Sequence, residues 1–156
     1  MHKVAWDVSE SHLMAQCITS RGVSETVPVS ILCQPATRPA VRNMRILCKS
    51  FPWDIHIHIP QSEQDKVITV GLVLEAIHGV LQEDLDVEDW ERKSSTLKKK
   101  IYTEMCARLG RAEPSIEANS RVLKIDCLLG RTEFMGLDSV NQSADANLWL
   151  LSLGSP

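Results

Sequence analysis

The chain has 156 residues, of which 44% are hydrophobic and 24% are charged, and its formal net charge at pH 7 is −3. This length and composition are typical of one globular domain with its own core, and they argue against disorder of the whole chain. A net negative charge argues against nucleic-acid binding, which uses clustered Lys and Arg.

The cysteines and the apolar runs indicate the compartment. There are five cysteines at wide spacings, without a C-x-x-C or zinc-ribbon pattern, which favours reduced thiols. No run approaches the roughly 20 apolar residues that span a bilayer, and the first residues lack the apolar core of a secretory signal. We therefore expect a cytoplasmic protein with no membrane partner and no cofactor.

Residues 1–40 are predicted to form an irregular N-terminal segment that packs on a single α+β domain of residues 41–156. Prolines at positions 28, 35 and 39 interrupt any long element in this segment. Val27–Leu32 fits only a short strand, which Pro28 would confine to an edge or an end.

Two runs with period-two alternation follow and predict a β-hairpin. Met44–Lys49 is the first, and Trp53–Ile59 has the clearest alternation in the chain. In the second run the isoleucines point to one face, whereas Asp54, His56 and His58 point to the other.

Two helices are predicted next. Thr69 is a typical N-cap, and apolar residues then recur at helical spacing from Val70 to Leu81. A second helix is expected to begin near Asp86 and to end at Gly110.

The remaining apolar runs predict strands. Val122–Leu129 alternates, with Lys124 and Asp126 on its polar face, and Leu148–Leu153 is apolar on both faces, as in a central strand or a subunit contact. The expected fold is α+β: a mainly antiparallel sheet of four to five strands with two helices on one face. A homodimer through Leu148–Leu153 is one expected partner arrangement.

Several strings together resemble one known family. They are Trp6-Asp7, Pro35-Ala-Thr37 with Pro39, Trp53–Ile57, Val67–Ile77 with His78, Lys124–Gly130, Phe134–Leu137 and Trp149. The chain is thereby similar to the fungal, mostly mushroom, family catalogued as domain of unknown function number 6699. The resemblance implies a stand-alone fungal domain and supplies no catalytic residues. Leu72 departs from the family pattern, where an acidic residue often stands; we interpret it as a tolerated change or a partner contact.

Asp54, His56 and His58 are the strongest candidates for a site. Alternate strand residues share a face about 6.5–7 Å apart, so the two imidazoles can converge on one metal ion or act as acid and base. Asp54 would then be a ligand or would orient an imidazole. The third interpretation is a polar face in contact with solvent; no metal is favoured, and any metal would use His56 and His58.

Further candidates join this face if the strand containing Lys124 and Asp126 lies nearby. Asp126 is then a fourth catalytic candidate; the ligand-binding candidates are Trp6, Arg45, Trp53 and Lys124. The N-terminal segment with Trp6 either folds over this face and makes a cleft or packs elsewhere.

Two functions remain. The first is a binding module for a small-molecule ligand or a protein, which we favour because the chain has no G-x-S-x-G, Walker or G-x-G-x-x-G motif. The second is a small metabolic enzyme that uses the His/Asp cleft for acid–base or metal-assisted chemistry.

Overall fold

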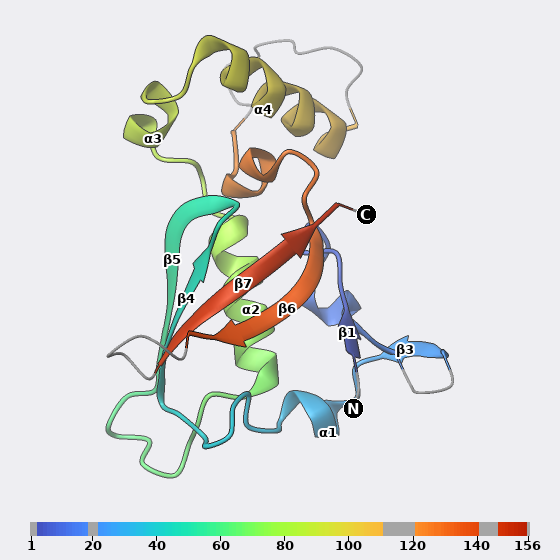
Figure 1. Ribbon diagram of the computed structural model, residues 1–156, viewed down its shortest axis with the longest axis vertical. Helices are drawn as coiled ribbons and strands as arrows, with labels where there is room; N and C mark the ends of the chain where they lie inside the picture. Colours follow the sequence, from blue (N-terminus) through green and yellow to red (C-terminus); the bar gives the residue numbers. More distant parts are fainter. Residues whose placement is uncertain (1–2, 19–21, 111–120, 141–146, 156) are drawn as a thin grey trace.

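The computed structural model describes residues 3–18, 22–110, 121–140 and 147–155. Its centre is a four-stranded sheet with the strand order β5-β4-β7-β6. The strands are β4 (Asn43–Cys48), β5 (Phe51–His58), β6 (Glu133–Ser139) and β7 (Leu148–Gly154). Helix α2 (Val70–Leu81) lies behind this sheet in Figure 1.

Strands β4 and β5 form the predicted hairpin, with Arg45 opposite His56. Ile55 and Ile57 are buried, whereas His56 and His58 are exposed. The predicted alternation of the second run is therefore confirmed.

Strand β7 is the predicted central strand. It pairs antiparallel with β6 but parallel with β4, so the sheet is mixed, and the expectation of a mainly antiparallel sheet is met by two of its three pairings. Because the backbone of β7 is paired on both edges, a homodimer through Leu148–Leu153 would have to use the side chains of this strand.

Helix α2 begins where the sequence predicts. The Thr69 hydroxyl accepts a hydrogen bond from the Leu72 amide at 3.3 Å and caps the first turn. The helix buries Val73, Leu74, Ile77 and Leu81, and it packs mainly against β5. This apolar stripe joins the isoleucines of β5 in the main core.

The predicted strand Val122–Leu129 is wrong, because this segment forms the 3-10 helix η2 (Lys124–Leu128). Ile125 and Leu128 are buried three residues apart, which is the period of a 3-10 helix. Leu129 (φ 52°) and Gly130 (φ 78°) then turn the chain in left-handed conformations. In a run this short, apolar residues fit both the period of two of a strand and the period of three of a 3-10 helix. The structure adopts the 3-10 helix.

In the structure, the segment predicted as the second helix forms two separate helices. They are α3 (Val87–Glu91), capped by Asp86, and α4 (Ser95–Arg108), capped by Ser94, and Gly110 follows in a left-handed conformation, as expected at a helix end. Helix α4 contacts η2, and both lie beyond one end of the sheet (Figure 1). The expected packing of two helices on one sheet face is therefore met by α2 alone.

The N-terminal segment is more regular than predicted. Its strands β1 (Lys3–Ala5), β2 (Gln16–Ile18) and β3 (Ser24–Thr26) form a small antiparallel sheet, and η1 (His12–Met14) links β1 to β2. The predicted strand Val27–Leu32 is wrong: Pro28 precedes a one-turn helix, α1 (Val29–Leu32), at a position where a missing N–H costs nothing.

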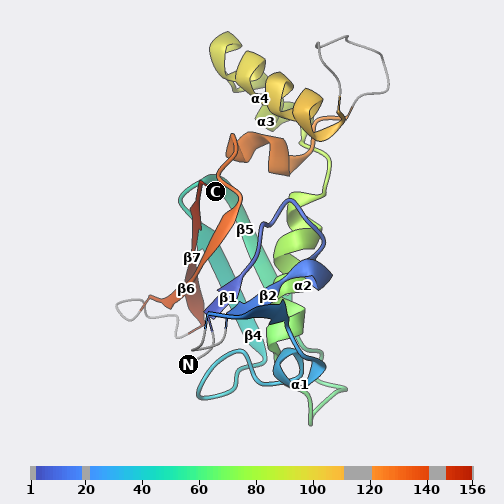
Figure 2. The same cartoon turned by 90° about the vertical axis from the view of Figure 1, so that its right-hand side faces the viewer.

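This segment packs on the α2 side of the main sheet and leaves the polar face of β5 open. The Trp6 ring contacts the His78 ring of α2 and the Phe134 ring of β6. Figure 2 shows β1 and β2 spanning the side between β6 and α2. Among the described residues, no helix lies on the other face of the sheet (Figure 2).

Candidate functional site

The open face of the β4–β5 hairpin carries four of the predicted site residues. Arg45 projects from β4, and Asp54, His56 and His58 project from β5, because all four lie at positions that alternate with buried ones. The His56 side chain is 65% exposed, and that of Arg45 is 44% exposed. The structure thus brings these residues together at a surface in contact with solvent.

Ionic and hydrogen-bond contacts order this face. The Arg45 guanidinium donates from Nε to Asp54 Oδ2 at 2.8 Å, and Nη2 donates to the same oxygen. His56 Nε2 lies 3.9 Å from that oxygen, whereas His58 donates from Nδ1 to the side-chain oxygen of Asn43. Asp54 is therefore engaged by Arg45 rather than held in a dyad with one imidazole.

These side chains border a shallow hollow of about 330 Å³, lined by Asn43, Arg45, His56, His58 and Asn147 among others. It offers hydrogen-bond donors and imidazole nitrogens without an enclosing wall. Within the described part of the chain, no group of three or more His, Cys, Asp or Glu side chains is placed to bind one metal ion. The geometry suits surface contacts with a ligand.

The backbone of β5 adds a second set of binding groups, because β5 is an edge strand. The Ile59 amide donates to the Arg42 carbonyl at 2.9 Å, whereas the Arg45 amide donates toward β7, to the Asn147 carbonyl at 3.0 Å. Opposite residues of an antiparallel pair alternate between bonded and non-bonded pairs, so His56, opposite Arg45, belongs to a non-bonded pair. The N–H and C=O groups of His56, and of His58 two residues on, therefore point to the outer edge.

One flank of α2 lies beside this edge. Leu72, Ala76 and Val80 recur every four residues, are half-buried, and share one side of the helix. The opposite side faces the N-terminal segment, where Gly71 approaches Leu32 and His78 approaches Trp6. Ala76 and Val80 therefore face away from that segment, toward the β5 edge, whereas Leu72 shares a hollow with Cys33 of that segment.

Trp53 and Lys124 also come together, but in a contact between elements. Lys124 Nζ lies 5.3 Å from the centre of the Trp53 ring and 2.5 Å from Glu83 Oε2. The Trp53 indole N–H donates to Asp89 of α3 at 2.7 Å. These two predicted ligand-binding residues thus join the end of β5 to η2 and α3.

Asp126 is 3% exposed and its carboxylate is saturated. It accepts hydrogen bonds from Arg108 Nε at 2.8 Å, from Arg108 Nη2 at 2.9 Å and from the Leu123 amide at 2.8 Å. The hydrogen bond to Asp126 raises the pKa of Arg108. Because η2 is not a strand of the main sheet, Asp126 does not share the face of the histidines.

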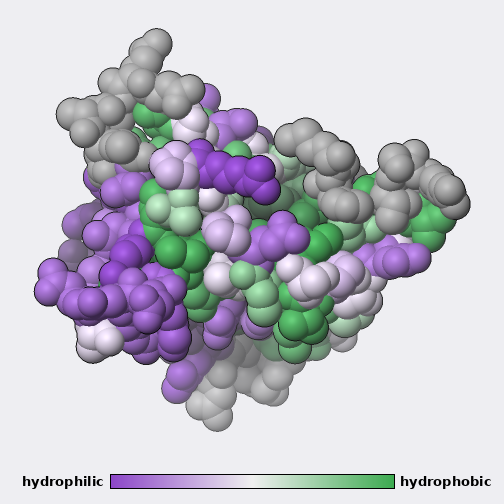
Figure 3. Space-filling model, turned by 90° about the horizontal axis from the view of Figure 1, so that it is seen from below, coloured by the Kyte–Doolittle hydropathy of each residue, from purple (hydrophilic) through white to green (hydrophobic). Residues whose placement is uncertain are grey.

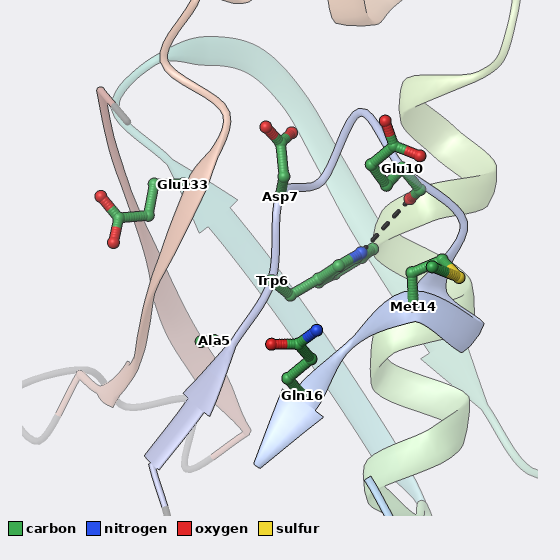
Figure 4. Close-up of a pocket in the computed structure, with 7 residues that line it drawn as sticks. All are labelled: Ala5, Trp6, Asp7, Glu10, Met14, Gln16 and Glu133. Carbon is green, nitrogen blue, oxygen red and sulfur yellow. Dashed lines mark hydrogen bonds between the residues drawn. The ribbon is translucent and has the colours of Figure 1, made fainter. Parts of the chain in front are cut away.

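Trp6 lines a different hollow, of about 460 Å³, on the α2 side of the sheet. Its indole N–H donates to the Glu10 carbonyl at 3.2 Å, and the ring is 4% exposed. Figure 4 shows the indole lying across this hollow, with the Asp7, Glu10 and Glu133 side chains around it. Trp6 therefore makes no cleft over His56 and His58.

The sequence interpretation missed the outer edge of β5 and the flank of α2. The edge depends on the parallel pairing of β4 with β7, two strands about a hundred residues apart, which a local pattern does not reveal. The flank had a visible signal, since Leu72, Ala76 and Val80 are apolar residues at helical spacing outside the buried stripe.

The fold and this site define an α+β domain with a mixed sheet that is open on one face and along one edge. A model of a family described as "Family of unknown function (DUF6699)" matches residues 4–146. The chain belongs to this family, which confirms the resemblance of its motifs. Comparison with curated proteins and with solved structures gave no significant match. None of the helices in the described residues has the length and apolarity needed to cross a membrane.

Proposed function

We propose that this domain is a protein-binding module that takes up an extended peptide segment of its partner as an additional strand along β5. The observation that carries this proposal is the outward direction of the His56 and His58 backbone groups on an edge strand. Strand addition uses such groups for affinity and the flanking side chains for specificity.

Strand length limits the recognised segment. Pro52 has no N–H to offer near the start of β5, so the usable edge lies toward His58. Each outward residue supplies one donor and one acceptor, and each net hydrogen bond contributes about 0.5–1.5 kcal/mol. The four groups of His56 and His58 thus contribute about 2–6 kcal/mol. A micromolar complex needs about 8 kcal/mol, so side-chain contacts with Asp54, His56 and His58 on the open face have to supply the difference.

The test uses His56→Pro, which removes one outward N–H and leaves the β4–β5 hydrogen bonds intact. Peptides are selected from a random eight-residue phage library on immobilised protein, and their Kd values are measured by fluorescence anisotropy. His56→Ala is the reference, because it lacks the imidazole but keeps the N–H. We expect His56→Pro to bind at least tenfold more weakly than His56→Ala.

A control separates lost binding from lost folding. Ile55 before the new proline is already extended, so His56→Pro should unfold cooperatively, whereas Ile57→Pro should not fold because Ile57 is bonded to β4. If His56→Pro does not fold, protection of the His56 and His58 amides from hydrogen exchange in the peptide complex replaces it. The proposal is wrong if no peptide is selected, if His56→Pro does not weaken binding, or if the peptide does not protect the two amides. It is also wrong if light scattering shows a dimer whose His56 and His58 amides are already protected without peptide.

A further inference from the structure

A hollow of about 410 Å³ lies where β5 ends and α2 begins. Ile59, Val67 and Leu72 form its apolar wall, and Cys33 at the end of α1 also lines it. Its polar lining consists of Glu63, Asp65, Lys66 and Thr69. Lys66 Nζ pairs with Glu63 Oε2 at 3.1 Å within this polar lining. Seen from below in Figure 3, polar side chains gather on the left, where the loop that follows β5 (residues 59–69) lies. Apolar side chains lie immediately beside them (Figure 3).

An added strand would present every second side chain to the Leu72 flank of α2, defined by Leu72, Ala76 and Val80. Alternate residues of a strand are spaced by about 6.5–7 Å, and residues four apart on a helix by about 6 Å along its axis. Successive inward side chains of the strand therefore meet successive positions of the flank. Ala76 leaves space in the middle, and Leu72 stands beside the hollow.

We infer that the partner segment carries a large apolar side chain that enters this hollow against Leu72. The inference rests on the proposed strand addition and specifies the chemistry of the bound segment. The size of the hollow, at the lower end of the ~300–1,000 Å³ typical of ligand pockets, fits one such side chain. Its apolar wall is continuous with the Leu72 flank, whereas the other face of the bound strand meets polar groups. The segment is thus expected to alternate apolar and polar residues.

Leu72→Glu is a selective test because it changes the wall and preserves the helix. Thr69 is the N-cap and Leu72 is the third residue after it, so glutamate at this position completes a capping box with the Thr69 amide. The capping box offsets part of the packing that is lost with the half-buried Leu72 side chain, so the variant should still unfold cooperatively. Val87→Glu is the matched control, since Val87 is 74% exposed on α3 and lies outside the hollow.

The same eight-residue phage library is selected on the unaltered protein, Leu72→Glu and Val87→Glu. We expect peptides from the unaltered protein and Val87→Glu to share one large apolar position, and Leu72→Glu to lose this preference and to bind those peptides at least tenfold more weakly. The inference is wrong if peptides that require the His56 N–H show no apolar position, or if Leu72→Glu binds them within twofold. Peptides insensitive to His56→Pro would instead contradict strand addition itself, and the inference with it.

Discussion

Burial determines the pKa and the reactivity of the thiols in this protein. Burial raises the pKa of Cys127 to about 11, and it also raises the pKa of the Cys48 thiol. Cys33, in contrast, is exposed at the end of α1. The exposed Cys33 thiol thus differs from the buried Cys48 thiol and the half-buried Cys127 thiol.

Alkylation should distinguish them. With iodoacetamide at pH 8, only about one Cys127 thiol in a thousand is ionised at a pKa of about 11. We expect mass spectrometry of tryptic peptides to show rapid modification of Cys33 and much slower modification of Cys127, with the Cys127 rate rising as the pH approaches 11. In denaturant the difference should vanish. Equal rates in the folded protein would contradict the raised pKa of the half-buried Cys127 thiol.

At the scale of single elements, the hairpin and α2 could be predicted because their periods are local. Trp53–Ile59 and Val70–Leu81 each show one period over their whole length. The site residues on the open face followed from the same alternation. The sequence-based prediction was wrong where two local conformations are both compatible with the pattern. This happened at η2, which was predicted as a strand, and before Ser94, whose side chain caps a new helix. The prediction also missed the edge position of β5, because this depends on pairing between strands that are far apart in the sequence.

The ion pair of Arg108 and Asp126 connects α4 to η2. Asp126→Ala leaves the Arg108 guanidinium without its partner and removes the acceptor of the Leu123 amide. We expect the free energy of unfolding to fall by about 2–4 kcal/mol in urea titrations. Asp84→Ala is the control: its pair with Arg121 has side chains 78% and 54% exposed and contributes less than about 1 kcal/mol.

The effect of Asp126→Ala should not depend on pH between 6 and 9. The pKa of Arg108 is raised in the folded state, so its stabilising contribution is complete below the unfolded value and is lost only in strong base. An Asp126→Ala cost no larger than that of Asp84→Ala would show that the pair does not hold α4 on η2.

At the scale of the whole molecule, the main sheet is covered by α2 and the N-terminal segment, and a helical lobe of α3, α4 and η2 lies at one end (Figure 1). Trp53 connects the two parts through its bond to Asp89 and its contact with Lys124. Two residues predicted to bind a ligand therefore link the lobe to the sheet, and the candidate binding surface lies farther along the same strand.

Trp53→Phe should loosen this connection without disturbing the core. Phenylalanine keeps an aromatic ring near Lys124 but removes the donor to Asp89, at a cost of about 1 kcal/mol. Hydrogen exchange followed by mass spectrometry should show faster exchange in α3 and α4, with β4 and α2 unchanged. Trp149→Phe is the control, because its indole nitrogen has no partner among the described residues. Unchanged exchange in the lobe would argue against a linking role for Trp53.

The interior position of β7 has a consequence for synthesis. β7 is the last of the elements in the described residues, yet it lies between β4 and β6 and buries Leu151 in the core. On the ribosome, the hairpin and α2 emerge early, but β4 and β6 each keep an unpaired edge until residue 154 has left the exit tunnel. The nascent chain therefore exposes two strand edges that chaperones can recognise, and its folding is completed only when β7 inserts between them.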